Sequence, residues 1–203
     1  KKSDTVAIIA PARKISSDEI SFAIKKIESW GLRVVLGKNI FKGHHQFAGT
    51  DERRMEDFQQ MMDEEKVKAI FCARGGYGTV RIIDGIKFDK FKRRPKWIIG
   101  YSDNTVFHSH LFSNYKIATL HGTMPINFPK NTKEALESLR KALFGEPLEY
   151  TVPGHKLNRK GFAEGVIVGG NLSLLHSLSG SKSDIDTGNK ILFLEDLDEY
   201  LYH

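Results

Sequence analysis

A serine stands where an apolar segment gives way to a helical pattern, in the stretch "KWIIGYSDNTVFHSHLF" at 96–112. The pattern predicts a buried strand, a sharp turn carrying Ser102, and then a helix. Two roles fit a serine there. It can cap the helix, or it can be a nucleophile at the sheet edge, with the N–H of Asp103 aimed at a tetrahedral oxyanion. The common elbow pattern G-x-S-x-G has glycine where this chain has Asn104, so spacing alone leaves both roles open.

The loop "RGGYG" at 74–78 is a second candidate, with glycines at 75, 76 and 78. Its backbone N–H groups can approach a phosphate or an oxyanion closely, although a tight strand-to-helix turn explains the glycines equally well. The loop is not a Walker A motif, because no Gly-Lys-Ser/Thr follows, and it lacks the G-x-G-x-x-G spacing of dinucleotide sites. Arg74 either binds a carboxylate or pairs with a surface acid, and Tyr77 lies beside it in the loop.

Two acids, Glu195 and Asp196, end the apolar run at 191–194. A carboxylate at a strand end is well placed to orient a histidine, and acids in a solvated loop are the alternative. Among the eight histidines, His121 in "LHGTMP" is the most site-like, because it ends a possible strand. No histidine pair has metal-ligand spacing and no H-E-x-x-H occurs, so we expect no metal site.

The composition is that of an ordinary globular protein with a basic surface. The chain has 203 residues, 40% apolar and 28% charged, and a formal net charge of +6. No run of about 18 apolar residues occurs, so no membrane-spanning helix is expected. The basic run at 87–97 interleaves aromatic residues and predicts a solvated surface loop, the alternative being a site for single-stranded nucleic acid. Cys72 is the single cysteine, which excludes an intrachain disulfide and fits a reducing compartment.

Strands and helices alternate over the first two thirds of the chain. Buried strands are predicted at 5–10, 32–37, 67–74, 96–100 and 117–122. Helices are predicted after Ser16 or Ser17, after Thr50, after the "GGYG" loop and after the Ser102 corner. This alternation, with short connections, predicts an α/β fold with a doubly wound, mostly parallel sheet. Ligands bind at the carboxyl ends of the strands in such sheets, and both candidate loops lie there.

A helix and then a polar connection with several glycines and prolines occupy 132–161 and predict a domain boundary. We expect an N-terminal α/β domain at 1–145 that carries the nucleophile, a linker at 146–161, and the beginning of a C-terminal α/β domain at 162–203. About 40 residues are too few for an independent core, so this second domain is expected to be incomplete.

Seven stretches together resemble the serine LD-carboxypeptidase family, which includes murein tetrapeptide carboxypeptidases and microcin-immunity peptidases. They are "IIAPA", "GTDERR", "ARGGYGTVRII", "GYSDNT", "LHGTMP", "GGNLSLL" and "ILFLEDLDEYLYH". Each stretch is weak by itself, but they occur in the family's order and cover nearly the whole chain. The resemblance favours the nucleophile role for Ser102 and implies an N-terminal sheet like that of class I glutamine amidotransferases.

The resemblance also implies roles for individual residues. Ser102 matches the nucleophile and Glu195 the acid of a Ser-His-Glu triad. The oxyanion hole would be formed by the N–H of Asp103 and one from the turn at Gly75 and Gly76.

The histidine of the family's triad lies several tens of residues after the "LED" segment, and His203 does not match it. The polypeptide of 203 residues is therefore expected to be inactive by itself. The family's substrate carries several carboxylates, which makes Arg74, with Tyr77 beside it, the expected substrate-binding residue.

The family reaction is release of the terminal D-alanine from murein tetrapeptides, during cell-wall recycling in the bacterial cytoplasm. The resemblance thus implies a hydrolase that needs no cofactor, takes a small anionic peptide, forms a homodimer and engages neither nucleic acid nor membrane. One alternative is an amidase that detoxifies peptide–nucleotide antibiotics. Another is a non-catalytic module that binds an anion at the "RGGYG" loop.

Overall fold

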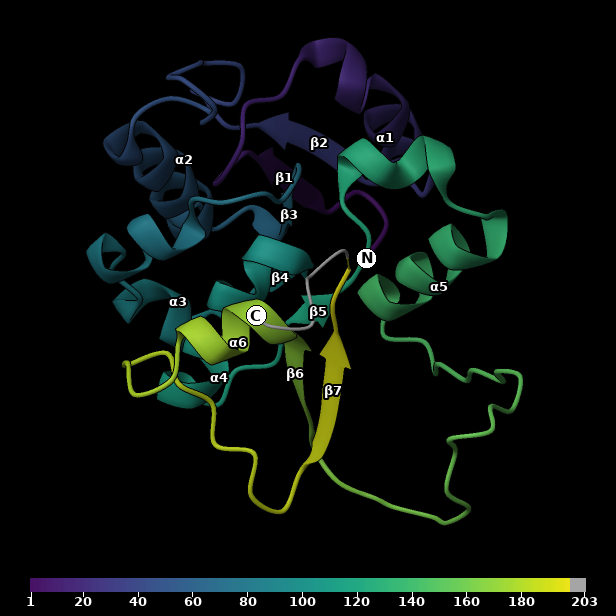
Figure 1. Cartoon of the computed structure of the whole chain (residues 1–203). Helices are drawn as coiled ribbons and strands as arrows, with labels where there is room; N and C mark the ends of the chain where they lie inside the picture. The colour runs from purple at the N-terminus through teal and green to yellow at the C-terminus, as the bar shows by residue number, and fades with distance from the viewer. Residues whose placement is uncertain (198–203) are drawn as a thin grey trace.

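The computed structural model describes residues 1–197 and contains a five-stranded sheet and a small two-stranded sheet (Figure 1). The large sheet has the strand order β2-β1-β3-β4-β5, and each strand pairs with its neighbour in parallel. Its strands are β1 (Thr5–Ile9), β2 (Arg33–Leu36), β3 (Val67–Cys72), β4 (Trp97–Gly100) and β5 (Leu120–His121). The predicted doubly wound α/β sheet is therefore confirmed.

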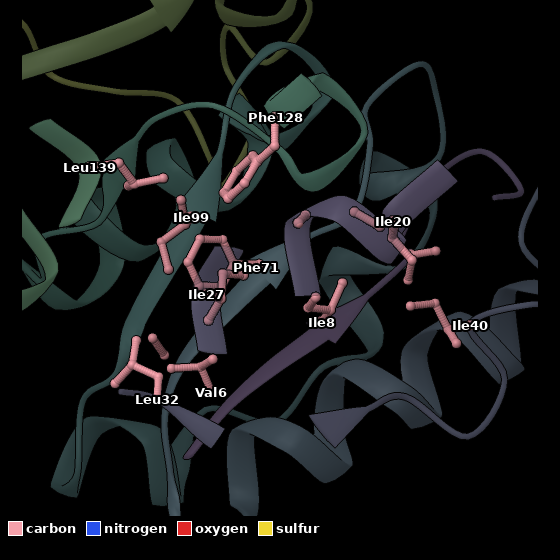
Figure 2. Close-up of a cluster of buried hydrophobic side chains, with 14 of the residues drawn as sticks. Val6, Ile8, Ile20, Ile27, Leu32, Ile40, Phe71, Ile99, Phe128 and Leu139 are labelled. Carbon is pink, nitrogen blue, oxygen red and sulfur yellow. The ribbon is translucent and has the colours of Figure 1, made fainter. Parts of the chain in front are cut away.

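Helices cover both faces of the sheet because its strands are apolar on both sides. Successive residues of a strand point to opposite faces, so Val6 and Ile8 pack into one core and Ala7 and Ile9 into the other. Figure 2 shows the first core. The helices on that face are α1 (Ser17–Ser29), α5 (Lys133–Phe144) and the 3₁₀ segment η4 (Pro125–Lys130), and those on the opposite face are α2 (Asp51–Asp63), α3 (Asp89–Arg93) and α4 (Thr105–Tyr115).

Two of the predicted helix starts are confirmed by their caps. The Ser16 hydroxyl accepts from the N–H of Glu19, whose carboxylate in turn accepts from the N–H of Ser16. Thr50 caps α2 through a bond from the N–H of Arg53. Both caps satisfy backbone donors that a helix leaves unpaired in its first turn.

The prediction of a helix after the "GGYG" loop is wrong. Two short 3₁₀ segments, η1 (Thr79–Arg81) and η2 (Ile83–Gly85), stand in its place. Gly78 enters them with φ +150°, a conformation that does not lead into an α-helix, and Gly85 ends them after two turns. Ile82 and Ile83 are still buried in the core, so the 3₁₀ segments place the apolar residues of this stretch inside the protein as a helix would have done.

The basic run at 87–97 lies at the surface and leads into β4 as predicted, with its charged residues exposed except Lys96, but residues 89–93 form the short helix α3 rather than a loop. Within it, α3 buries Phe91, and Phe88 just before it is also buried. Lys96 is buried as well, and its ammonium donates to the Met61 carbonyl at 3.1 Å near the end of α2. The aromatic rings of this run therefore belong to the core, where they cannot stack on bases, and this disfavours the nucleic-acid alternative.

The small sheet pairs β6 (Ile167–Asn171) with β7 (Ile191–Glu195) in parallel, with α6 (Leu172–Ser177) between them in the chain. It is fixed to the first residue of α4, where the N–H of Asn171 donates to the hydroxyl of Thr105 at 3.0 Å. The preceding residues 146–166 contain neither helix nor strand. Between residues 1 and 197, no helix is long and apolar enough to cross a bilayer.

Candidate active site

Ser102 lies on a strained turn at the carboxyl end of β4. It opens the 3₁₀ segment η3 (Ser102–Asn104) with φ +59°, a left-handed conformation that costs a non-glycine residue about 1 kcal/mol. A side chain at Gly100 would place its Cβ 2.6 Å from the side-chain nitrogen Nδ2 of Asn104 and 3.0 Å from Asn104 Cβ, so the turn closes this tightly only around glycine. Ser102 makes no helix-capping hydrogen bond to any residue that the structure describes. Its geometry is that of a nucleophile elbow.

The "RGGYG" loop passes directly beside this serine. A Cβ atom at Gly75 would lie 3.4 Å from Ser102 Cβ and 3.5 Å from Ser102 Oγ. The next residue, Gly76, has φ +118°, which L-residues rarely adopt. The fold therefore brings together the serine and the glycine turn that the resemblance names as nucleophile and oxyanion donor.

Thr79 ties the glycine loop to the elbow and was not singled out in the sequence. Its N–H donates to a carboxylate oxygen of Asp103 at 3.0 Å, and its hydroxyl donates to the Asp103 carbonyl at 2.6 Å. Both residues are buried, Asp103 with 1% of its surface exposed. Burial raises the pKa of the Asp103 carboxyl, and the hydrogen bonds from Thr79 oppose that rise. This pair of bonds fixes the backbone on which the predicted oxyanion donor of Asp103 depends.

Arg54 holds the other side of the loop. Its guanidinium donates to the carbonyls of Pro11 and Gly78 and forms an ion pair with Asp51, and 1% of the residue is exposed. A Cβ at Gly78 would lie 2.6 Å from Arg54 Nη1, so the arginine needs a glycine there. Burial lowers the Arg54 pKa, and Asp51 opposes that change. An arginine on the apolar side of α2 was the sequence signal for this role.

Glu195 ends β7 opposite Asn171 in the ladder, and Asn171 is bonded to Thr105, three residues after the nucleophile. The Oε1 atom of Glu195 is buried and has no hydrogen-bond partner within residues 1–197. Burial raises the pKa of Tyr101, and the nearby Glu195 carboxylate raises it further. A buried carboxylate oxygen close to the elbow is the arrangement required of a residue that orients a catalytic histidine.

Asp196 has a structural role in the geometry. Burial raises its pKa, but bonds from the hydroxyl and N–H of Ser173 lower it, as do those from Leu197 and Asn171, and the net direction is downward. Its carboxylate thus ties the end of β7 to the first turn of α6.

The histidines near the elbow differ in their surroundings. His108 is buried on α4, with Nε2 2.9 Å from the Gly100 carbonyl and Nδ1 2.8 Å from the Thr119 hydroxyl, and burial lowers its pKa to about 4. His121 contacts the Phe193 ring at 4.9 Å between centroids, and burial lowers its pKa also. Within the part of the chain that the structure describes, no three His, Cys, Asp or Glu side chains converge as a metal site would require.

The two predicted substrate-binding residues of the loop, Tyr77 and Arg74, differ in their contacts with the rest of the protein. Tyr77 is exposed and packs beside Phe47, with ring centroids 6.2 Å apart. Arg74 donates to the Lys14 carbonyl at 3.1 Å and lies 3.8 Å from the carboxylate of Glu19. The Arg74 guanidinium is therefore already engaged by the protein.

Known proteins resemble this chain over nearly its whole length. Residues 6–122 match the LD-carboxypeptidase N-terminal domain and residues 164–203 the LD-carboxypeptidase C-terminal domain. A probable murein peptide carboxypeptidase of Bacillus subtilis is 39% identical over 99% of this chain, and the murein tetrapeptide carboxypeptidase of Pseudomonas aeruginosa is 32% identical over 97%. The chain spans 65% of the first relative's length and 67% of the second's.

The fold is shared with a solved relative. The crystal structure of muramoyltetrapeptide carboxypeptidase from Oxalobacter formigenes is 28% identical, with a TM-score of 0.83 over 98% of this chain and 67% of that one. On these matches, the chain belongs to the LD-carboxypeptidase family.

Proposed function

We propose that the intact protein is a serine LD-carboxypeptidase that releases the terminal D-alanine of murein tetrapeptides. The observation that carries the proposal is the strained serine at φ +59° beside the glycine turn, where a Cβ added at Gly75 would lie 3.5 Å from the Ser102 hydroxyl oxygen. A serine held in this way beside backbone N–H donors is suited to acyl transfer. The names of the relatives supply the substrate class, since two of them are described as murein peptide or tetrapeptide carboxypeptidases.

In the proposed reaction Ser102 Oγ attacks the carbonyl carbon of the bond that joins an L-centre to D-alanine. Its proton passes to the histidine that the family resemblance places after the "LED" segment, and Glu195 orients that histidine. The negative charge that develops on the carbonyl oxygen is stabilised by the N–H of Asp103 and by one from the Gly75–Gly76 turn. The histidine then protonates the leaving amine of D-alanine. Water hydrolyses the acyl-enzyme and restores the serine.

The space for the peptide lies at the carboxyl ends of β4 and β5. A cavity of about 250 Å³ opens there, lined by Tyr101, His121, Gly122, Thr123, Asn127 and Asn131. Its amide and hydroxyl groups can pair with the polar backbone of a short peptide. The proposal includes reaction in the bacterial cytoplasm and assembly as a dimer, both of which remain predictions.

The test is Ser102→Ala in the intact protein, with D-alanine release from a murein tetrapeptide as the measurement. Loss of the nucleophile should reduce the rate by on the order of 10⁴-fold or more while the thermal unfolding midpoint stays close to that of the wild type. The control is Ser21→Ala, which removes an exposed hydroxyl. Ser109 is unsuitable as a control because its hydroxyl is buried and hydrogen-bonded. A Ser102→Ala protein that keeps most of its rate would show that the serine is not the nucleophile.

A further inference from the structure

We propose that Arg13 binds the terminal carboxylate of the peptide from a position over the Gly76 backbone. This rests on the proposed function, because it names the residue that makes the enzyme a carboxypeptidase rather than an endopeptidase. The resemblance had directed attention to Arg74 instead. Arg13 lies far from the "RGGYG" loop in the sequence, and only the fold brings the two together.

The geometry begins at the glycine turn. A Cβ at Gly76 would lie 2.6 Å from Arg13 Cδ and 2.9 Å from Arg13 Nε, so the arginine side chain lies directly on this residue. A Cβ at Gly75 would lie 3.5 Å from Ser102 Oγ. The nucleophile and the Arg13 guanidinium therefore flank successive residues of one turn.

That spacing matches the substrate of a carboxypeptidase. The terminal carboxylate lies one residue beyond the carbonyl that is attacked, and successive residues in an extended chain are about 3.8 Å apart at Cα. A peptide that runs along the turn from Gly75 toward Gly76, with its scissile carbonyl at Ser102, would carry its carboxylate toward Arg13.

Arg13 also has its guanidinium available. Within residues 1–197 it forms no ion pair with a carboxylate, and it is exposed. The other arginines around the loop are engaged: Arg54 and Arg81 by Asp51, and Arg74 by Glu19 and the Lys14 carbonyl. A cation that lacks a protein partner beside a nucleophile is the group that can accept a carboxylate from the ligand.

The backbone of Arg13 is held in place while its side chain remains accessible. Arg13 forms a bridge with Phe47, and on either side the N–H of Lys14 donates to Gln46 and that of Ala48 to Ala12, both at 3.0 Å. Arg13 is thus anchored by β-type pairing rather than carried on a free loop. An anchored arginine loses less freedom on binding than a mobile one and presents two parallel donors to a carboxylate.

The experiment compares a murein tetrapeptide with its C-terminal amide as substrates of the intact protein. Wild-type enzyme should prefer the free acid in kcat/KM. Arg13→Gln should lower kcat/KM for the acid roughly 10- to 100-fold, mainly through KM, and leave that for the amide within about 3-fold. Arg13→Lys should recover part of the loss, because it restores the charge without the two-pronged geometry. Lys14→Gln is the matched control, since it removes one charge at the next residue and should leave the preference intact.

Equal losses on acid and amide with Arg13→Gln would overturn the assignment, as would loss of the preference in Arg74→Gln alone. If wild-type protein releases no D-alanine at all, the proposed function fails and binding decides the role of Arg13. The probe is then N-acetyl-L-alanyl-D-alanine, titrated by NMR into the Ser102→Ala protein with the dipeptide amide as reference. The carboxylate site is supported if the Ser102→Ala protein binds the acid more tightly than the amide and this preference disappears when Arg13→Gln is added. Equal binding of both probes, or an acid preference that survives Arg13→Gln, refutes it.

Discussion

Gly75 is the loop residue whose added Cβ would contact the nucleophile. Its backbone angle suits an L-residue, so the fold can accept alanine there, and the substitution acts by filling the space beside Ser102. The added methyl would lie 3.4–3.5 Å from Ser102 and 3.4 Å from Met124 Cε, in the space that the oxyanion must reach. We expect Gly75→Ala to lower kcat for D-alanine release about 100-fold, comparable to loss of one oxyanion donor.

The control for that substitution is Gly43→Ala, since no atom lies within 4 Å of a Cβ added there. Steady-state kinetics of both variants, with thermal unfolding of each, separate an effect on the site from an effect on the fold. A Gly75→Ala enzyme with wild-type kcat would place the oxyanion away from this turn.

His108 predicts a pH dependence of stability with a definite sign. Burial lowers its pKa to about 4, against an ordinary value of 6.5. Between these two values the unfolded chain binds a proton that the folded chain does not, so the free energy of unfolding falls as pH decreases from 6.5 to 4. The difference of roughly 2.5 pKa units corresponds to about 3 kcal/mol, which is fully lost below pH 4.

Urea unfolding of wild-type protein and His108→Gln at neutral pH and near pH 4 measures this contribution. The stability advantage of wild type over the variant should shrink by about 3 kcal/mol at the lower pH, because glutamine does not titrate. An advantage independent of pH would mean that His108 titrates normally in the folded protein.

At the scale of elements, the junction between the glycine loop and the elbow depends on Thr79. Thr79→Val keeps the shape of the side chain but removes the hydroxyl donor to the buried Asp103 carbonyl, which then keeps the bond from the N–H of Thr105. We expect a loss of stability of about 1–2 kcal/mol, and a several-fold fall in kcat as the Asp103 backbone loosens. Thr79→Ser keeps the hydroxyl and should retain kcat even if it loses some stability. The measurements are urea unfolding and D-alanine release, and a kcat equal in both variants would confine Thr79 to a structural role.

The elements themselves could be predicted because their signals are local. The cap at Ser16 and the apolar strands at 5–10 and 67–74 are each specified by neighbouring residues, and the parallel sheet follows from their alternation. The 3₁₀ turns after Gly78 could not be predicted, because the apolar pattern of a helix persists there while the glycine angles differ.

The site was predicted only in part, for a related reason. Ser102 and the glycine loop can be recognised from short sequence motifs, and the fold places them together. Thr79, Arg54 and Arg13 make contacts with residues distant in sequence. Nothing local indicates this for Thr79 and Arg13, and for Arg54 the one signal is its place on the apolar side of α2. The roles that the resemblance assigns to Ser102, Glu195 and Arg74 remain predictions, although the buried oxygen of Glu195 supports the role given to that residue.

At the scale of the whole molecule, the candidate catalytic residues lie at one edge of the large sheet. The strands β3 and β4 end at the glycine loop and the elbow, and β7 brings its carboxylate to the same edge through the bond between Asn171 and Thr105 (Figure 1). Arg13, which is exposed and forms no ion pair within residues 1–197, adds positive potential at this edge, and that potential would draw in an anionic peptide. The rate of association should therefore depend on ionic strength.

The outer strand of the small sheet sets the last prediction. β7 pairs only with β6 among the described strands, and three consecutive apolar residues along it are exposed, Leu192 by 46%, Phe193 by 42% and Leu194 by 48%. An unpaired strand edge with apolar side chains promotes association between chains. We expect the polypeptide of residues 1–203 to sediment with a mass that rises with concentration, and Leu192→Lys to lower that mass, because a charge on an edge strand opposes pairing. The same change at the exposed Phe22 on α1 is the control and should leave the mass unchanged. If the mass is the same with and without Leu192→Lys, β7 is not the surface through which this polypeptide associates.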